Sequence, residues 1–365
     1  MSLVILRESM EDGFMDGKMR AMVLHDWVKK WGSNLKLEHV PIPKVGYKEA
    51  LVKVRACGVG LTVSNFLIGE SSSDCRLLPR IPGHEIAGDV VEVGEGVDNV
   101  AVGDRVLVYF YLTCGHCRFC LGGMQDLCID SKGVVGVQCD GGYAEYVKVP
   151  ADNLLPFPDS ISYVKATVIN DALATPVHVM KRKAEVRPGH DVMVIGAAGG
   201  VGIHMIQVAK VFGGNVIGVD VDDEKLMKVK ELGAEIVVNA RRQSVVEEVR
   251  KATGGKGVDS AIDMVGNRET LATCLESVGR QGKVVVLTGH PGVTVEVSPR
   301  RLVRDEITVL GSRYTTKTEF MEAIELVRSG KVKPVVSESR PLERVEELHL
   351  KLSENRLLGR GAAIP

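Results

Sequence analysis

Hydrophobic and polar residues are arranged in two different patterns along the chain. From residue 20 to about residue 165, short apolar runs rich in Val, Ile and Tyr are separated by Gly, Pro and Asp, as in "ALVKVRACGVG" and "YAEYVKVPADNLLPFP". Runs of this length, bounded by turn-forming residues, are typical of β-strands. We therefore expect a mostly-β domain in the first part of the chain.

The second pattern of hydrophobic and polar residues extends from about residue 171 to residue 312. Six buried-strand signals, separated by helical segments, read "DVMVIG", "NVIGVD", "EIVVNA", "SAIDMV", "KVVVLTG" and "ITVLGS". Strands that alternate with helices predict a doubly wound parallel sheet, so the expected fold class is α/β. Beyond it, "TKTEFMEAIELVRSGKVKP" predicts an amphipathic helix that ends at Gly330, and "LERVEELHLKLSEN" predicts a second one.

Length and composition limit the number of domains, the kinds of partner and the cellular location that can be expected. A chain of 365 residues is too long for one compact core, so two domains are expected. The net charge of -1 gives no reason to expect a nucleic-acid or acidic-membrane partner. No apolar run reaches the ~18 residues of a membrane-spanning helix, and the apolar run in "MSLVILRESM" is too short for a signal peptide. We therefore expect a cytoplasmic protein, in a reducing compartment where thiolates bind metals more often than they form disulfides.

Half of the eight cysteines lie in one segment, with the spacing C-x2-C-x2-C-x7-C. Four thiolates suit a tetrahedral zinc ion at ~2.3 Å per bond. An iron-sulfur cluster and unligated thiols are the alternatives. A zinc ion with four protein ligands has no position left for substrate, so this site would be structural and catalysis must lie elsewhere. The predicted ligands are Cys114, Cys117, Cys120 and Cys128.

A glycine-rich segment follows the first strand of the second region. Strand 192–195 runs into the turn "GAAGGVG", and a helix then extends through Ala209. Glycines permit a tight turn and a close approach of a pyrophosphate, which the helix N-terminus faces with its dipole and free N–H groups. A simple strand–helix turn without a ligand is the alternative. The glycines of this turn are Gly196, Gly199, Gly200 and Gly202.

An acidic residue strengthens the prediction of a dinucleotide site. Asp220 closes the next strand, 24 residues after Gly196, close to the distance expected for a ribose-binding acid. Its carboxylate would accept hydrogen bonds from the adenosine ribose hydroxyls and would repel a 2′-phosphate. Val221, Asp222 and Asp223 follow, with no Arg to receive that phosphate. The sequence therefore favours NAD over NADP.

The order of these motifs resembles the zinc-containing alcohol dehydrogenase family of the medium-chain dehydrogenase/reductase superfamily. "PGHEIAGDVVEVG" is followed by the four-cysteine loop and then by "GAAGGVG", and the resemblance extends from about Lys18 to the C-terminus. It implies a GroES-like catalytic domain, a Rossmann domain and a structural zinc on the four cysteines. The expected division is an N-terminal extension (1–18), the GroES-like domain with its zinc lobe (19–170), the NAD-binding Rossmann domain (171–312) and a return to the catalytic domain (313–365).

The resemblance also implies a set of cofactor contacts and an oligomer. In this family the Rossmann domains pair through the strand near "ITVLGS", so a homodimer or homotetramer is expected. Candidate cleft residues are Phe66, Tyr109 and Phe110. The expected cofactor-binding residues are Thr175, Gly196, Gly199, Gly200, Val201, Gly202, Asp220, Lys225, Val265 and Leu287.

The family's catalytic zinc, which polarises the alcohol or carbonyl oxygen during hydride transfer, has an altered site in this chain. The ligand cysteine is replaced by Gly60 in "CGVGLTVSNF", and Cys57, three residues earlier in a strand, would point elsewhere. Thr62 keeps the hydroxyl that relays the substrate proton. The supporting aspartate is Val63, and the histidine that ends the proton relay is Asn65, which takes up no proton at neutral pH.

The other ligand positions keep polar residues. His84 and Glu85 match the "GHE" motif, and Asp171 falls at the third ligand position. In one interpretation these three residues and a water bind zinc or another divalent ion. In the other, the thiolate and the aspartate that supports the metal ligands are lost together with the metal, and Thr62 and His84 polarise the substrate by hydrogen bonds. A buried structural histidine and an aspartate that caps a helix are further alternatives.

These features predict an NAD-dependent enzyme that interconverts a small-molecule alcohol and a ketone or aldehyde, with Thr62, His84 and Asp171 as catalytic residues. The alternative enzyme is an NAD(P)H-dependent reductase of an activated C=C bond, such as an enoyl thioester, enone or quinone. A third possibility is a nucleotide-binding redox sensor without catalysis. Neither nucleic acid nor membrane is expected as a partner.

Overall fold

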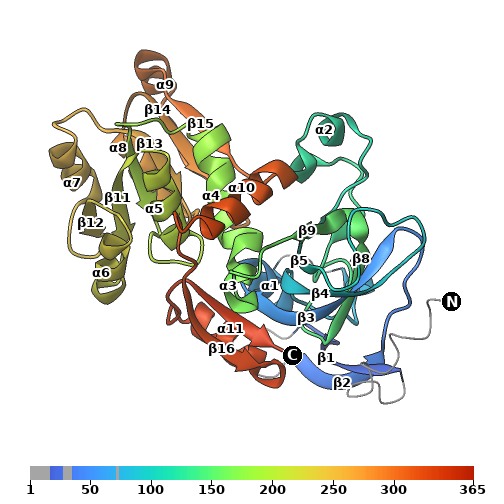
Figure 1. Cartoon of the computed structure of the whole chain (residues 1–365). Coiled ribbons are helices and arrows are strands. Elements are labelled where there is room, and N and C mark those ends of the chain that lie inside the picture. Colours follow the sequence, from blue (N-terminus) through green and yellow to red (C-terminus); the bar gives the residue numbers. More distant parts are fainter. Residues whose placement is uncertain (1–16, 28–34, 71–73) are drawn as a thin grey trace.

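The computed structural model describes residues 17–27, 35–70 and 74–365, and Figure 1 shows the chain in ribbon form. An antiparallel-rich sheet and a parallel sheet lie on opposite sides of the view, with α3, α4 and α10 between them. No helix in the described ranges is long and apolar enough to cross a membrane.

The first sheet is built mainly from the first part of the chain, as the short apolar runs predict. Its order is β16-β17-β3-β4-β5-β9, and β8 pairs with β3. Separate two-stranded ladders are formed by β1 with β2 and by β6 with β7. The bounds are β1 (Lys18–Leu24), β2 (Leu35–Pro41), β3 (Glu49–Val59), β4 (Glu85–Val93), β5 (Arg105–Val108), β6 (Tyr111–Leu112), β7 (Gly133–Val134), β8 (Tyr146–Pro150), β9 (Leu154–Pro156), β16 (Val336–Pro341) and β17 (Arg360–Ile364).

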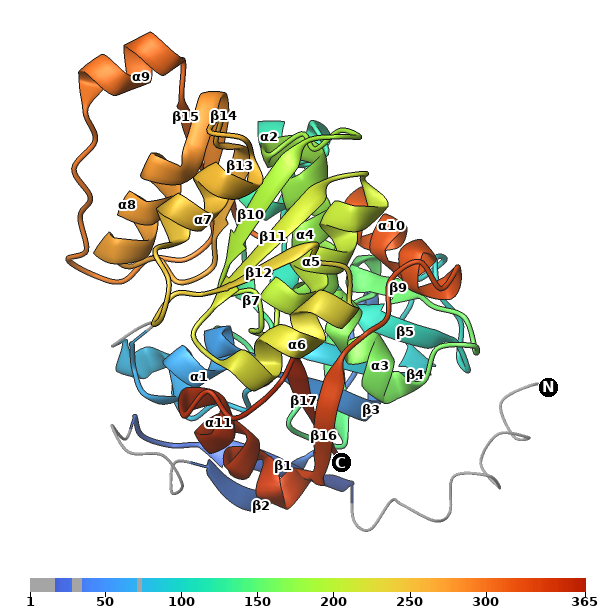
Figure 2. The ribbon, with the colours of Figure 1, turned by 90° about the vertical axis from the view of Figure 1, so that its left-hand side faces the viewer.

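The second sheet contains six parallel strands in the order β12-β11-β10-β13-β14-β15. This is the strand order of a dinucleotide-binding doubly wound fold, which confirms the predicted α/β fold class. Figure 2 shows these strands with the helices that pack around them. The bounds are β10 (Asp191–Ile195), α5 (Gly202–Val211), β11 (Asn215–Asp220), α6 (Asp223–Glu231), β12 (Ile236–Asn239), α7 (Val245–Ala252), β13 (Val258–Asp263), α8 (Arg268–Ser277), β14 (Val278–Val286), α9 (Pro299–Asp305) and β15 (Thr308–Gly311).

Helices join the two sheets. Residues 163 to 183 form a helix in which α-helical segments alternate with wider π-type turns at Ile169–Leu173 and Val179–Lys183. The expected boundary between residues 170 and 171 therefore falls inside this helix. The remaining helices are α1 (Leu61–Leu67), α2 (Arg118–Leu121), α3 (Tyr163–Val168), α4 (Ala174–His178), α10 (Lys317–Arg328) and α11 (Val345–Ser353).

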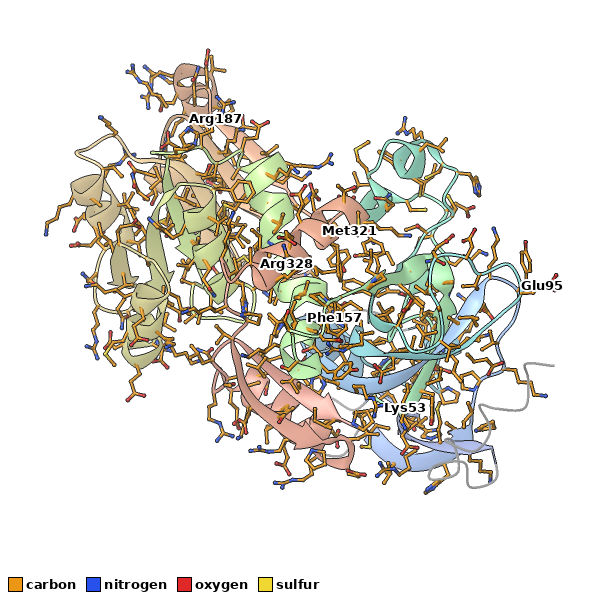
Figure 3. All side chains as sticks on the ribbon, in the orientation of Figure 1. Lys53, Glu95, Phe157, Arg187, Met321 and Arg328 are labelled. Atoms are coloured by element: carbon orange, nitrogen blue, oxygen red, sulfur yellow. The ribbon has the colours of Figure 1, made fainter. Side chains whose placement is uncertain are left out.

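Both amphipathic helices of the C-terminal part occur as predicted. A capping box begins α10, because Thr316 accepts from the N–H of Glu319 and the Glu319 side chain returns to the Thr316 N–H. The chain then returns to the first sheet, where β17 pairs antiparallel with β3. Apolar side chains of the strands form the core, which includes the labelled Phe157 in Figure 3.

Register places the loops of the parallel sheet at one edge. Ile195 at the end of β10 is paired with Val219 of β11 and with Asp263 of β13. The segments that follow these strands begin with Gly196, Val221 and Met264, so they meet at the carboxyl edge. Ligands of doubly wound sheets bind at this edge.

Candidate active site, cofactor site and zinc site

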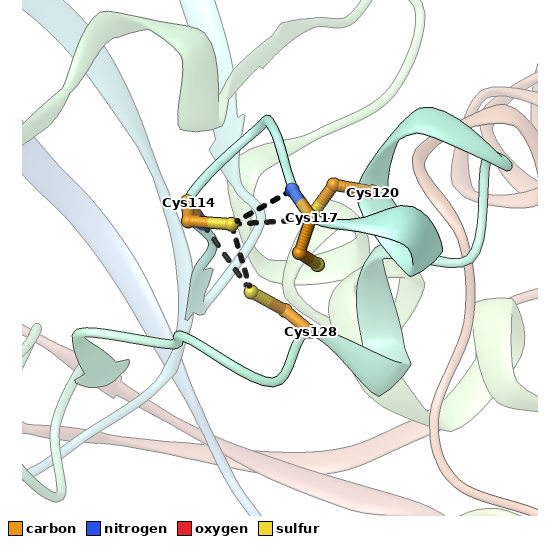
Figure 4. Close-up of side chains that lie close together, drawn as sticks. All are labelled: Cys114, Cys117, Cys120 and Cys128. Atoms are coloured by element: carbon orange, nitrogen blue, oxygen red, sulfur yellow. Dashed lines mark hydrogen bonds between the residues drawn. The ribbon is translucent and has the colours of Figure 1, made fainter.

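The four predicted cysteine ligands converge in the lobe that contains α2 (Figure 4). Cys114 Sγ lies 3.6 Å from Cys128 Sγ and 3.9 Å from Cys120 Sγ, and all four sulfur atoms lie within 4.8 Å of one another. Tetrahedral bonds of ~2.3 Å place sulfur atoms about 3.8 Å apart, so the cluster has the size of a single zinc ion.

Backbone groups of the lobe also favour thiolates. The N–H groups of Cys114 and Cys117 point at sulfur atoms of the cluster, each at 3.3 Å. Backbone N–H groups of Cys120 and Ile129 lower the pKa of Cys117 to about 6. All four residues are free cysteines, so no disulfide joins any two of them. Because all four positions of a tetrahedral ion are filled, the site fits a structural metal.

The glycine-rich turn has the backbone geometry that only glycine tolerates. Gly196 follows β10 with a φ of 78°, in the left-handed region. A Cβ atom on Gly202, at the start of α5, would overlap the carbonyl oxygen of Gly196. These two glycines therefore permit the close strand–helix connection that presents free N–H groups of α5 to an anion.

Asp220 is held in place at the end of β11. Its Oδ2 accepts from the N–H of Ala198 at 2.8 Å, and its Oδ1 accepts from the N–H of Val221 at 2.8 Å. The remaining lone pairs can accept from two ribose hydroxyls. Sequence reasoning missed one nearby cation, Arg242, which pairs with Asp223 at 2.7 Å.

The other predicted cofactor residues lie in two places. Val265 lies beside the glycine turn, since a Cβ atom on Gly196 would contact its side chain at 3.3 Å, and Val201 caps α5. Leu287 directly follows β14 and is partly buried. The side chain of Lys225 is held by hydrogen bonds. Its Nζ donates to Asn355 Oδ1 at 3.0 Å and to the carbonyl of Leu357 at 2.9 Å. Lys225 therefore ties the Rossmann domain to the C-terminal segment.

A second group of potential metal ligands is buried beside the start of β4. His84 and Glu85 are fully buried, and Asp171 lies on the π-type turn of the joining helix. His84 Nε2 lies 3.8 Å from Glu85 Oε1 and 4.0 Å from Asp171 Oδ2. Among the described residues, neither ring nitrogen of His84 has a hydrogen-bond partner. An unpartnered buried imidazole facing two carboxylates fits a divalent cation.

Gly60 explains how Glu85 reaches this position. A Cβ atom on Gly60 would lie 2.6 Å from Glu85 Oε1 and 3.3 Å from Arg360 Cζ, and one on Gly58 would overlap the same carboxylate. Glu85 therefore fills space that a side chain at position 60 would need, and a cysteine there would require both neighbours to move. Cys57 is buried on the other side of the strand, against Gly83 and Gly142, as expected.

Arg360 is the residue of this site that sequence reasoning missed. Its guanidinium Nη2 lies 3.0 Å from Glu85 Oε1 and 2.9 Å from Asp171 Oδ2, and its side chain is only 4% exposed. Its partners lie 275 and 189 residues away in the sequence, so no local pattern points to it. Burial raises the pKa of Glu85, whereas His84 and Arg360 outweigh burial at Asp171 and lower its pKa.

Thr175 supports the same cluster. Its hydroxyl donates to Asp171 Oδ1 at 2.9 Å, which leaves Oδ2 to face His84 and Arg360. Asp171 thus lies inside a helix, and the helix-cap alternative does not apply. Thr175, expected to contact the cofactor, is seen here as a support for Asp171.

Thr62 and the three aromatic residues have different surroundings. Thr62 lies in the first turn of α1 with an exposed side chain, and its hydroxyl makes no hydrogen bond within the described ranges. Phe110 packs its ring at right angles to His84, with 4.5 Å between ring centroids. Phe66 and Tyr109 are fully buried: Phe66 packs on Trp27, and the Tyr109 hydroxyl donates to the Thr315 carbonyl. They are core residues, which corrects their assignment to the cleft.

Comparisons with known proteins agree with this arrangement. Residues 46–159 match the alcohol dehydrogenase GroES-like domain, and residues 200–329 match the zinc-binding dehydrogenase family. An alcohol dehydrogenase of Geobacillus stearothermophilus is 36% identical over 343 residues, which cover 94% of this chain and 98% of the relative. An NAD-dependent alcohol dehydrogenase of Sulfurisphaera tokodaii is 36% identical over 354 residues, covering 95% and 100%. A crystal structure of an NAD-dependent alcohol dehydrogenase superposes with a TM-score of 0.87 at 32% identity, covering 95% and 100%.

Proposed function

Because the chain belongs to the zinc-containing alcohol dehydrogenase family, we propose that it is an NAD-dependent oxidoreductase that interconverts an alcohol and a ketone or aldehyde by hydride transfer. One observation carries the proposal. Arg360 touches both Gly200 of the dinucleotide turn and the carboxylates of Glu85 and Asp171, so the cofactor site adjoins the buried polar cluster. The similarity to alcohol dehydrogenases over nearly the whole chain favours this reaction over reduction of an activated C=C bond.

Different residues of the chain would bind the different parts of NAD. The N–H groups at the start of α5 and the Arg360 guanidinium, which lies against Gly200, would bind the pyrophosphate, and Asp220 would accept from the ribose hydroxyls. Val201, Val265 and Leu287 are proposed to line the same site. NAD supplies the hydride acceptor when bound.

We propose one structural zinc on the four cysteines and a second divalent-cation site on His84, Glu85 and Asp171. The buried nitrogens of His84, which lack a partner in the described chain, support the second site. A cation bound there would polarise the substrate oxygen as a Lewis acid. The Thr62 hydroxyl would take the proton that the alcohol loses and release its own proton to solvent, because its side chain is exposed and Asn65 takes up no proton as a histidine would.

Two further proposals concern the setting of the enzyme. A zinc site of four thiolates suits a reducing compartment, which supports the cytoplasm as its location. The edge strand β15 exposes Val309 at 46%, and an open edge of this kind pairs readily with a second copy. We therefore propose a homodimer or homotetramer, and light scattering that detects only monomer at micromolar concentration would contradict it.

A substrate panel tests the proposed reaction. Primary and secondary alcohols should reduce NAD, aldehydes or ketones should oxidise NADH, and enones and enoyl thioesters should not be reduced at the C=C bond. His84→Gln should abolish turnover and leave the fold intact, whereas His25→Gln, a change at an exposed histidine paired with Glu38, should have no effect. Reduction of enones without any turnover of alcohols would overturn the proposal.

A further inference from the structure

The buried guanidinium of Arg360 lies between the carboxylates of Glu85 and Asp171 and the dinucleotide turn at Gly200. Arg360 is the first residue of β17, and its backbone N–H donates to the Val335 carbonyl at 3.0 Å. Its Nη2 binds Glu85 Oε1 and Asp171 Oδ2, while its Nη1 lies against the glycine turn, only 2.5 Å from where a Cβ atom on Gly200 would be. One side chain thus contacts the carboxylate cluster and the dinucleotide turn together.

Arg360 and a divalent cation would compete for the same oxygen atoms. Glu85 Oε1 and Asp171 Oδ2 are the atoms that face His84 Nε2, at 3.8 and 4.0 Å, and they are also the atoms that Arg360 binds. When both carboxylates are ionised, the single guanidinium neutralises only one of their two charges. Buried charges need partners, so the carboxylates retain Arg360 until another cation replaces it.

A pyrophosphate at the glycine turn would offer Arg360 a different partner. A planar guanidinium binds phosphate oxygens through two parallel hydrogen bonds as well as it binds carboxylates. The Nη1 side of Arg360 already faces Gly200, so a small rotation of the side chain would exchange one anion for the other. Glu85 and Asp171 would then have free lone pairs.

From this geometry we propose that Arg360 couples the two sites: the cofactor pyrophosphate draws Arg360 away from Glu85 and Asp171, which lets His84, Glu85 and Asp171 bind a divalent cation. This inference rests on the proposed function, because it requires the dinucleotide to bind at the glycine turn. Since binding free energies are reciprocal, the cation strengthens cofactor binding by the same factor.

The coupling is tested on the full chain with its cysteine site loaded with zinc. Co²⁺ is titrated without nucleotide, with saturating ADP-ribose and with saturating adenosine, and its visible absorption reports coordination. We expect ADP-ribose, which carries the pyrophosphate, to tighten Co²⁺ binding by roughly 5- to 150-fold, the usual range of such coupling. Adenosine, which lacks the pyrophosphate, should leave the affinity for Co²⁺ unchanged. Calorimetry should show that Co²⁺ increases the affinity for ADP-ribose by the same factor.

Two variants separate Arg360 from a general closure of the domains. Without nucleotide, Arg360→Gln should bind Co²⁺ as tightly as the wild-type protein does with ADP-ribose. Addition of ADP-ribose should not increase the affinity of this variant for Co²⁺ any further. Arg356→Gln is a matched change at an exposed arginine that lies four residues before Arg360 and pairs with Glu354. This variant should keep the wild-type coupling. Coupling that survives in Arg360→Gln would overturn the inference.

The remaining outcomes also decide between the proposals. Binding of ADP-ribose with no change in Co²⁺ affinity, or no Co²⁺ binding under any condition, overturns the coupling and leaves the NAD-dependent reaction standing. No binding of ADP-ribose or NAD at all would overturn the proposed function itself. If Arg360→Gln does not fold, the comparison of ADP-ribose with adenosine on the wild-type protein still tests the inference.

Discussion

Replacing Asp220 by Asn should weaken the binding of NAD and shift the protein toward NADP. The substitution keeps the shape of the side chain and removes its charge. In the structure the two carboxylate oxygens each accept one backbone N–H, from Ala198 and Val221, both at 2.8 Å. One of these N–H groups would face the amide NH₂ of Asn, which cannot accept a hydrogen bond.

The expected size of the effect follows from these contacts. A hydrogen bond to a charged group contributes ~1.5–3 kcal/mol and one to a neutral group ~0.5–1.5 kcal/mol, so two ribose hydroxyls lose about 2 kcal/mol together. That loss corresponds to roughly 30-fold weaker binding of NAD. Solvent screening at this partly exposed carboxylate reduces the figure toward about tenfold. NADP should gain, because its 2′-phosphate no longer meets the negative charge of the carboxylate.

Fluorescence titrations and kcat/KM for both cofactors would measure the shift. Asp222→Asn is the matched control: it removes the same charge two residues away, and Asn still caps α6 as Asp222 does through the N–H of Lys225. The control should bind NAD normally. An unchanged ratio of NAD to NADP affinity in Asp220→Asn, or a wild-type protein that prefers NADP, would refute the reasoning.

Three further predictions follow from the same structure. Cys117→Ser should lose the structural zinc and unfold at a lower temperature, whereas Cys139→Ser, outside the cluster, should keep its zinc; a Cys117→Ser protein of full stability without zinc would contradict a structural role. Thr62→Val should lower kcat by roughly 10²–10³-fold if its hydroxyl acts on the reacting oxygen, with rescue by Thr62→Ser, and an unchanged kcat would remove Thr62 from the mechanism. Burial lowers the pKa of His204 to about 4 and of His349 to about 3, so both stay neutral in the folded state while the unfolded chain takes up protons below about pH 6.5. Stability should therefore fall as the pH drops from about 6.5 toward 4, by about 2 kcal/mol per histidine at pH 5, and urea unfolding of His204→Gln should show a smaller drop than that of the wild-type protein.

The architecture and two of the three sites could be predicted because their signals are local in the sequence. Each strand of the parallel sheet is an apolar run, and the turn after β10 needs glycine at Gly196 and Gly202 for steric reasons. The four cysteines lie within fifteen positions, so their meeting follows from a short loop. Asp220 closes β11 at the distance expected from the glycine turn.

The third site could be predicted only in part, because it depends on contacts between distant segments. Gly60 signals a missing thiolate, but only the structure shows that the Glu85 carboxylate and Arg360 fill the space beside it. Arg360 reaches the site through the pairing of β17 with β3, which no sequence pattern near residue 360 indicates. The sequence does not show that Phe66 and Tyr109 are core residues, because buried and exposed aromatic side chains have the same local signature.

Transfer of deuterium tests the central claim most directly. The protein would be incubated with NAD and a secondary alcohol that carries deuterium on the carbinol carbon, and the reduced cofactor would be analysed by mass spectrometry. A hydride-transferring alcohol dehydrogenase should yield reduced cofactor that contains one deuterium, together with the unlabelled ketone. Formation of no reduced cofactor from any alcohol, or of reduced cofactor without deuterium, would contradict the account.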